Sequence, residues 1–163
     1  MSDHAVALYR NPLAPAAADP ISLRHPWRLW RKAIWFRANP RDTAYMQARL
    51  AEHFPEASFV DVDSDPDWPR KVDGATTVVL LYPDSIGLGF ARLESRARGL
   101  APEAEFVVVN GRRRKFPFDS AARRRLYPRR FLEWTMLLEF FMGLGILIAT
   151  PFLLVFDTVR GRS

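Results

Sequence analysis

The sequence predicts an α/β protein that ends in one transmembrane helix, and three observations lead to this fold class. Two near-continuous apolar, β-branched runs flank an amphipathic segment, which is the pattern of a strand–helix–strand unit in a parallel sheet. A stretch near the C-terminus is apolar on every helical face. Between these two parts lies a run of arginines interleaved with aromatic residues.

Residues 1–22 are predicted to form a flexible start and linker. The short apolar run Ala5–Tyr9 has the composition of an edge strand. The Ala/Pro stretch after it is expected to form a loop, because each proline fixes φ and lacks an N–H donor.

Residues 23–111 are predicted to form a cytosolic α/β domain. A first helix lies between Pro26 and Pro40, and a second spans Asp42–Phe54 with Asp42 as its cap. The first helix has a Trp-rich face opposite a basic one, so it either covers a sheet or lies at a membrane interface. A strand is expected at Ser58–Val62.

The clearest pattern in this domain is a strand at Thr76–Tyr82, a helix at Ile86–Arg98 and a strand at Glu105–Val109. Together with the preceding elements it predicts a small three-layer Rossmann-like domain with three or four mostly parallel strands. Ligands of such sheets bind beyond the carboxyl ends of the strands. The candidate ligand-binding residues are therefore Asp84, Ser85, Gly87, Gly89, Asn110 and Gly111.

Two glycines near a helix start could direct backbone N–H groups at a phosphate. The alternative is that Ser85 caps the helix and the glycines serve a tight turn. A dinucleotide fingerprint would need a third glycine where Arg92 stands, and the spacing of a P-loop is absent. No cofactor is therefore predicted.

No metal site is predicted either. The chain has no cysteine, and its three histidines are scattered. Asp61 and Asp63 are weak candidates for holding a divalent ion, but the acidic run around them lacks the glycine and the final glutamate of a calcium loop.

The net charge of +6 comes from a single stretch. Residues 1–111 carry thirteen basic and fourteen acidic side chains, whereas residues 112–130 carry nine basic and one acidic. We expect residues 112–133 to form a basic, aromatic juxtamembrane segment that binds anionic phospholipids and is cytoplasmic by the positive-inside rule. Its predicted head-group contacts are Arg112, Arg113, Arg114, Lys115, Arg123, Arg124, Arg125, Arg129 and Arg130. Its position beside a membrane segment disfavours nucleic acid as the partner.

Residues 134–156 are predicted to cross the inner (cytoplasmic) membrane and residues 157–163 to form a short tail. As a helix this apolar stretch would be about 35 Å long, enough for a hydrocarbon core of about 30 Å. A re-entrant hairpin, bent at Thr150–Pro151, is the alternative. Polar and small residues form a seam that is expected to contact a membrane-protein partner or a second copy: Glu139, Gly143, Gly145, Ala149, Thr150 and Asp157.

Three functions fit this sequence. The first is a non-catalytic, membrane-anchored accessory subunit that recruits or positions a membrane enzyme, of envelope polysaccharide or lipid-linked glycan assembly. In architecture the chain resembles the small anchoring halves of two-part glycosyltransferases, although those carry their anchor at the N-terminus. The second is a glycosyltransferase-like enzyme that acts on a nucleotide sugar or lipid phosphate. The third is a membrane-tethered RNA- or ligand-binding regulator.

Overall fold

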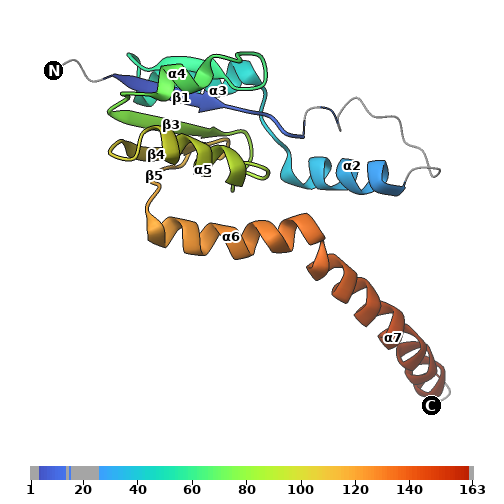
Figure 1. Ribbon diagram of the computed structural model, residues 1–163. Coiled ribbons are helices and arrows are strands. Elements are labelled where there is room, and N and C mark those ends of the chain that lie inside the picture. The colour runs from blue at the N-terminus through green and yellow to red at the C-terminus, as the bar shows by residue number, and fades with distance from the viewer. Residues whose placement is uncertain (1–3, 14, 16–25, 162–163) are drawn as a thin grey trace. The chain divides into compact units, whose positions relative to one another are not determined.

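The computed structural model describes residues 4–13, 15 and 26–161 (Figure 1). It divides into two compact units, Met1–Arg130 and Phe131–Ser163. The first unit contains the sheet and the helices packed on it, and the second contains the apolar C-terminal helix.

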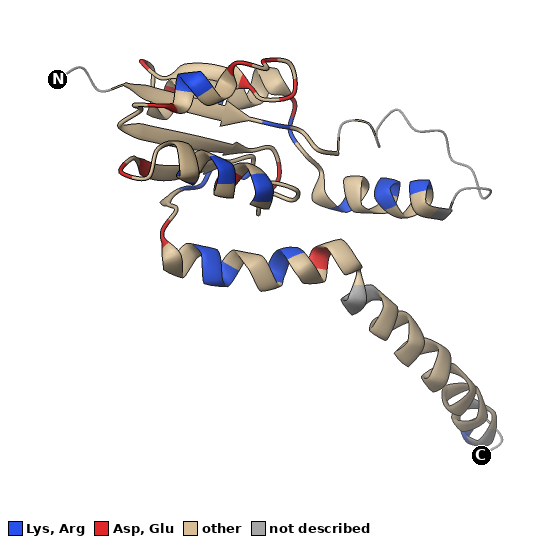
Figure 2. Cartoon of the chain, viewed as in Figure 1, with Lys and Arg blue, Asp and Glu red and all other residues tan. Residues whose placement is uncertain are grey.

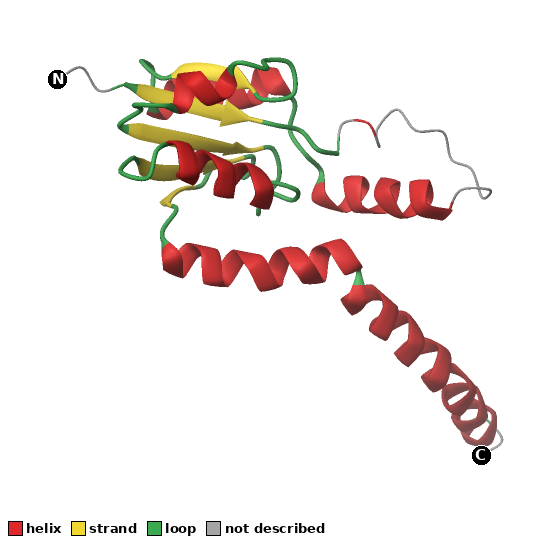
Figure 3. Cartoon of the chain, in the orientation of Figure 1, coloured by secondary structure: helices red, strands yellow, loops and turns green. Residues whose placement is uncertain are grey.

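The first unit is built on a five-stranded sheet with the order β2-β1-β3-β4-β5 (Figure 3). The first four strands pair in parallel, and β5 pairs antiparallel with β4. The α/β class with a mostly parallel sheet is thus as predicted, but there are five strands rather than three or four. The strands are β1 (Ala5–Tyr9), β2 (Ser58–Asp61), β3 (Thr77–Tyr82), β4 (Glu105–Asn110) and β5 (Lys115–Pro117).

Two strands differ from the prediction. β1 is an interior strand between β2 and β3, and not an edge strand. Val6 to Tyr9 are buried, because an apolar run without alternating polar residues needs a covering layer on both of its faces. β5 comes from the start of the basic run, where Phe116 pairs with Val108 and packs on the core. The remaining part of the predicted linker, residues 14 and 16–22, lies outside the described residues.

Helices cover both faces of the sheet, as the three-layer prediction requires. Val6 and Leu8 of β1 belong to a cluster with α4 (Trp68–Val72) and α5 (Ala91–Leu100). Ala7 and Tyr9 face the opposite way, toward α3 (Thr43–His53). This alternation follows from the two-residue period of a strand.

Among the described residues, no side chain of α2 (Pro26–Ala38) belongs to either of these two core clusters. Its Ile34 is buried, whereas Trp27 and Phe36 are 58% and 63% exposed. The two expectations for this helix, covering the sheet or lying at a membrane interface, both stay predictions.

Two helices complete the chain, α6 (Ser120–Thr135) and α7 (Leu137–Arg160). Among the described residues, no single helix is long and apolar enough to cross a membrane, although residues 120–135 and 140–156 satisfy the length and composition criteria as a bent pair. The span expected at residues 134–156 therefore stays a prediction.

A close backbone contact joins the ends of β3 and β4. The N–H of Gly111 donates to the carbonyl of Tyr82 at 2.8 Å. A Cβ atom on Gly111 would lie 2.3 Å from the carbonyl oxygen of Pro83, so only glycine fits without a backbone shift.

We therefore expect Gly111→Ala to lower the free energy of unfolding by about 1–3 kcal/mol, through overpacking at this junction. The matched control is Gly99→Ala in α5, where an added Cβ meets nothing within 4 Å and the better helix propensity should stabilise slightly. Denaturant unfolding of the full-length protein in mild detergent measures both. Equal free energies of unfolding for the two variants would contradict the close contact between Gly111 and the Pro83 carbonyl.

Candidate functional site

The loop after β3 is organised by one carboxylate. Oδ1 of Asp84 accepts hydrogen bonds from the N–H groups of Ile86 (2.7 Å) and Gly87 (2.5 Å), and Oδ2 accepts from Leu88 (2.9 Å). Burial raises the pKa of Asp84, while these three N–H groups and Arg130 favour its charged form. The backbone donors that the sequence suggested for a phosphate are therefore already bound to the protein's own carboxylate.

This loop also delays the helix that follows it. α5 begins at Ala91, whereas the sequence pattern predicted a start at Ile86. Gly87 has φ of +68°, and a Cβ there would come within 3 Å of the Tyr82 ring. The glycines consequently serve a tight turn, which was the alternative interpretation of this segment.

The order in which the strands are added to the sheet reverses between β1 and β3, and this switch point is the usual ligand position in open α/β folds. Here the loops from the two strands approach each other closely, since a Cβ on Gly89 would lie 2.8 Å from Cγ of Pro12. The candidate site lies one strand further on, at the ends of β3 and β4.

Asn110 joins these two strand ends. Its side chain is buried, and its Nδ2 donates to the carbonyl of Ser85 at 3.0 Å. Its Oδ1 accepts from the N–H groups of Arg112 (3.1 Å) and Arg114 (3.0 Å). Asn110 thus shapes the turn that positions Arg114 and leads into β5.

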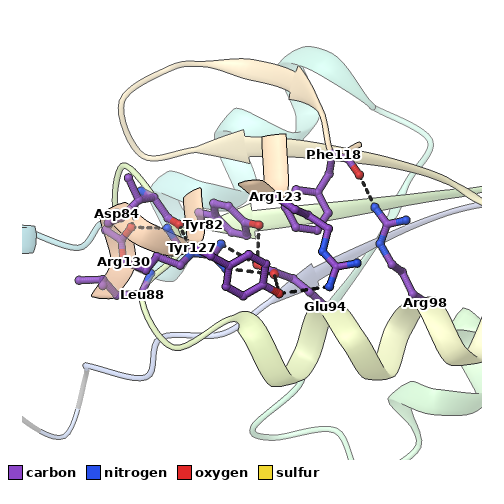
Figure 4. A network of polar contacts seen from close by, with 11 residues as sticks. Tyr82, Asp84, Leu88, Glu94, Arg98, Phe118, Arg123, Tyr127 and Arg130 are labelled. Atoms are coloured by element: carbon purple, nitrogen blue, oxygen red, sulfur yellow. Dashed lines mark hydrogen bonds and ion pairs between the residues drawn. The ribbon is translucent and has the colours of Figure 1, made fainter. Parts of the chain in front are cut away.

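A buried ion pair between Arg130 and Glu94 joins the second half of α6 to α5 (Figure 4). Nη2 of Arg130 lies 2.6 Å from Oε1 of Glu94, and Nη1 lies 3.0 Å from Oε2. Nε of Arg130 donates to the carbonyl of Ile86 at 2.6 Å. The two side chains are 8% and 1% exposed, so the bidentate pair is shielded from water.

Two tyrosines complete the network around Glu94 (Figure 4). The Tyr82 hydroxyl donates to Oε1 at 2.6 Å, and the Tyr127 hydroxyl lies 3.4 Å from Oε2. Burial first, and then the charge of Glu94, raise the pKa of Tyr82 well above its ordinary value. Burial opposes the charged form of Arg130, but the hydrogen bond to Glu94 and the further interactions with Glu94 and Tyr82 together outweigh burial and raise the pKa of Arg130. The network therefore favours a neutral Tyr82 and a charged Arg130.

A pocket of about 530 Å³ lies between the ends of β3 and β4, strand β5 and the first turns of α6. Its apolar lining comes from Ile86, Phe116, Pro117, Ala121, Ala122 and Leu126, and its polar lining from Ser85, Asn110, Arg114, Asp119, Arg125 and Arg129. Every lining residue belongs to the first unit.

The polar lining is predominantly cationic. Three arginines of the lining are exposed: Arg114, Arg125 and Arg129. None of them forms an ion pair with another residue of the described part of the chain. Asp119 is the opposing charge, and its carboxylate accepts the N–H of Ala122 at 2.7 Å at the start of α6. Figure 2 shows the basic residues of α6 in blue. The arrangement suits an anion that also carries an apolar group.

The structure thus brings together residues that the sequence assigned to two separate sites. Ser85 and Asn110 were ligand-binding candidates, and Arg114, Arg125 and Arg129 were head-group candidates. The other ligand candidates build the loops: Asp84, Gly87 and Gly89 after β3, and Gly111 at the strand junction.

Four of the nine predicted head-group residues have side-chain contacts within the protein. Arg130 is buried against Glu94, which makes it a structural residue and not a head-group contact. Arg123 lies over the Tyr127 ring, Lys115 lies over the Phe54 ring, and Arg113 hydrogen-bonds to Tyr45. Six of the predicted arginines are exposed: Arg112, Arg113, Arg114, Arg124, Arg125 and Arg129.

The weak metal candidates have protein partners. Asp63 forms an ion pair with Arg10 at 2.8 Å, and Oδ1 of Asp61 accepts the N–H of Asp63 at 3.1 Å. Within the described residues no group of three or more acidic or histidine side chains could hold an ion.

Glu94 was not among the site residues predicted from the sequence. A signal was present, because Glu94 follows Phe90 by four residues and precedes Ala97 by three, which places it on the apolar stripe of α5. A lone glutamate on such a stripe requires a buried partner. Its partner, 36 residues later, could not be read from helical spacing.

No protein-family model matches this chain, and neither a curated protein nor a solved structure matches it.

We expect Glu94→Gln to lower the free energy of unfolding by about 3–5 kcal/mol, because it leaves the Arg130 charge buried without a counter-charge. Glu105→Gln is the matched control at an exposed position, and it should change stability by no more than about 0.5 kcal/mol. Thermal or denaturant unfolding of the full-length protein measures the difference. A loss below about 1 kcal/mol for Glu94→Gln would argue that the pair does not hold α6.

Proposed function

We propose that this protein is a non-catalytic, membrane-anchored accessory subunit whose α/β domain lies in the cytoplasm. It would recruit or position a membrane enzyme. We favour an enzyme of envelope polysaccharide or lipid-linked glycan assembly. The glycan assignment rests on analogy between a phosphate-ready basic surface and a nucleotide-type α/β fold.

The observation that carries the proposal is the exposure of α7. The twelve large apolar side chains from Phe140 to Phe156 are between 41% and 72% exposed. At 100° per residue they are spread around the helix. Apolar surface on this scale marks contact with lipid or with another protein.

The charge distribution supports the orientation that we propose. The six exposed arginines lie in residues 112–129, directly before the apolar helix, and anionic lipids attract such cations by about 1 kcal/mol each. Phe131 and Trp134 are exposed beside them and have the amphipathic character of interfacial residues. By the positive-inside rule these cations support our proposal that the first unit lies at the cytoplasmic face of the inner membrane.

The small residues of α7 support a helix partner. A Cβ atom added to Gly143 or Gly145 meets nothing within 4 Å, so both positions offer the close approach that helix association in membranes needs. Thr150 donates its hydroxyl to the carbonyl of Ile146 at 2.7 Å. The side chains of Glu139 and Asp157, two further members of the predicted seam, lie outside the described ones.

The catalytic alternative, a glycosyltransferase-like enzyme, has less support. It relied on Asp84 and Ser85, and the Asp84 carboxylate is buried and bound by three backbone N–H groups. The third possibility, a membrane-tethered RNA- or ligand-binding regulator, shares the basic surface and the α7 anchor, but it gives no role to the small-residue seam of α7.

Anchoring predicts that the full-length protein sediments with membranes and is released by detergent, not by salt. Introducing Leu147→Lys with Leu154→Lys should transfer it to the supernatant, because each lysine costs about 2.5–3.5 kcal/mol at the centre of a membrane helix. Gly161→Lys, which adds a charge beyond the apolar stretch, should stay with the membranes. Wild-type protein that remains soluble without detergent would refute the anchoring.

The accessory role predicts a stoichiometric partner or a second copy in mild detergent. Replacing Gly143 and Gly145 by leucine should abolish this association while leaving the membrane fraction unchanged, because bulky side chains hold the helices apart. Leu144→Ile is the control within the same turn. Size-exclusion chromatography with light scattering measures the assembly, and an identical mass for the double variant and wild type would remove the helix contact.

A further inference from the structure

We infer that the 530 Å³ pocket between β5 and α6 binds a phosphomonoester that carries an apolar group, with the phosphate on Arg114, Arg125 and Arg129 and the apolar group on Phe116 and Leu126. This inference adds a ligand to the proposed accessory role. It rests on residues of the first unit, so it stands whether or not α7 lies in a membrane.

The charge in the pocket argues for a phosphate dianion. Three guanidinium groups and one carboxylate leave an excess of two positive charges along its lining. The carboxylate of Asp119 is already engaged at the start of α6, where it accepts the N–H of Ala122. Guanidinium groups bind phosphate oxygens in bidentate pairs, and this geometry makes arginine better suited to phosphate than lysine.

The separation of the arginines in the sequence shows that the pocket is a tertiary feature. Arg114 comes from the turn that Asn110 shapes, while Arg125 and Arg129 are one helical turn apart on α6. The Glu94–Arg130 pair fixes this part of α6 against α5. Arg129 therefore lies next to a residue that is itself locked, and the cationic lining is preorganised for a ligand.

The apolar lining argues against a bare inorganic anion. Phe116 and Leu126 are half-buried and pack against the core, so the floor of the pocket belongs to the folded interior. An alkyl group on this floor would add about fourfold in affinity for each buried methylene. Phosphate sites for inorganic ions do not need such a floor.

The test is isothermal titration of full-length protein in non-ionic detergent with two soluble probes, inorganic phosphate and mono-n-butyl phosphate. We expect butyl phosphate to bind at least about tenfold more tightly than inorganic phosphate. Equal affinities for the two probes, or no binding of butyl phosphate, would overturn the inference.

Matched variants distinguish binding in the pocket from nonspecific attraction by the positive charge of the protein. Arg125→Gln and Arg114→Gln should each weaken butyl phosphate about tenfold or more. Arg124→Gln removes the same charge from the neighbouring position of α6, which does not line the pocket, and should change affinity less than about twofold. Equal losses for Arg124→Gln and Arg125→Gln would overturn the site. Because Arg114 and Arg125 belong to different elements, a folding defect in one variant leaves the other as the test.

A competition arm identifies the source of the phosphate. Displacement of butyl phosphate by phosphatidate in the same micelles, and not by phosphatidylcholine, would assign the site to a lipid head group. Displacement only by soluble phosphomonoesters would assign it to a free metabolite, and either result supports the phosphate site. Failure of the membrane sedimentation test above would leave these affinities unchanged, so the two proposals fail independently.

Discussion

The buried pair between Glu94 and Arg130 determines how the basic part of this chain is used. Taking two charges out of water costs several kcal/mol each, and here the cost is offset by a bidentate contact, by the Tyr82 hydroxyl and by the carbonyl of Ile86. The pair connects α5, a helix of the sheet layer, to α6, which carries the exposed arginines. Without it, the contacts of α6 with the domain would be weaker, and among the described residues they include the hydrogen bond from Tyr127 to Glu94 and the apolar packing of Ala122 and Leu126.

A charged helix that is held in place has different properties from a flexible basic tail. A tail attracts any anionic surface through its net charge, whereas fixed arginines can recognise one anion through geometry. The same segment therefore has two surfaces with separate roles. Arg130 and Tyr127 face the domain and hold the helix, while Arg125 and Arg129 face the pocket. Beyond this segment, the exposed apolar side chains of α7 supply the surface on which our membrane proposal rests.

The strands and helices with strong local patterns were predictable from the sequence. The β3–α5–β4 unit was found from its apolar runs, but the helix begins later because Gly87 and Gly89 have positive φ angles, which a right-handed helix cannot contain. The interior position of β1 was missed, although its unbroken apolar run was a usable signal. β5 was not predicted, because it has only three residues and lies within a basic run that was interpreted by its charge. The Glu94–Arg130 pair and the shared pocket join residues far apart in the chain, and periodicity carries no information on such contacts.

Hydrogen–deuterium exchange of the full-length protein in mild detergent tests most directly whether α6 is held against the domain. We expect the amides of residues 123–130 to be protected from exchange to the same order as those of α5, since both helices would open only when the domain unfolds. If residues 123–130 exchange as fast as an unstructured peptide while α5 stays protected, the buried pair does not fix the helix. The preorganised phosphate pocket would then lose its basis.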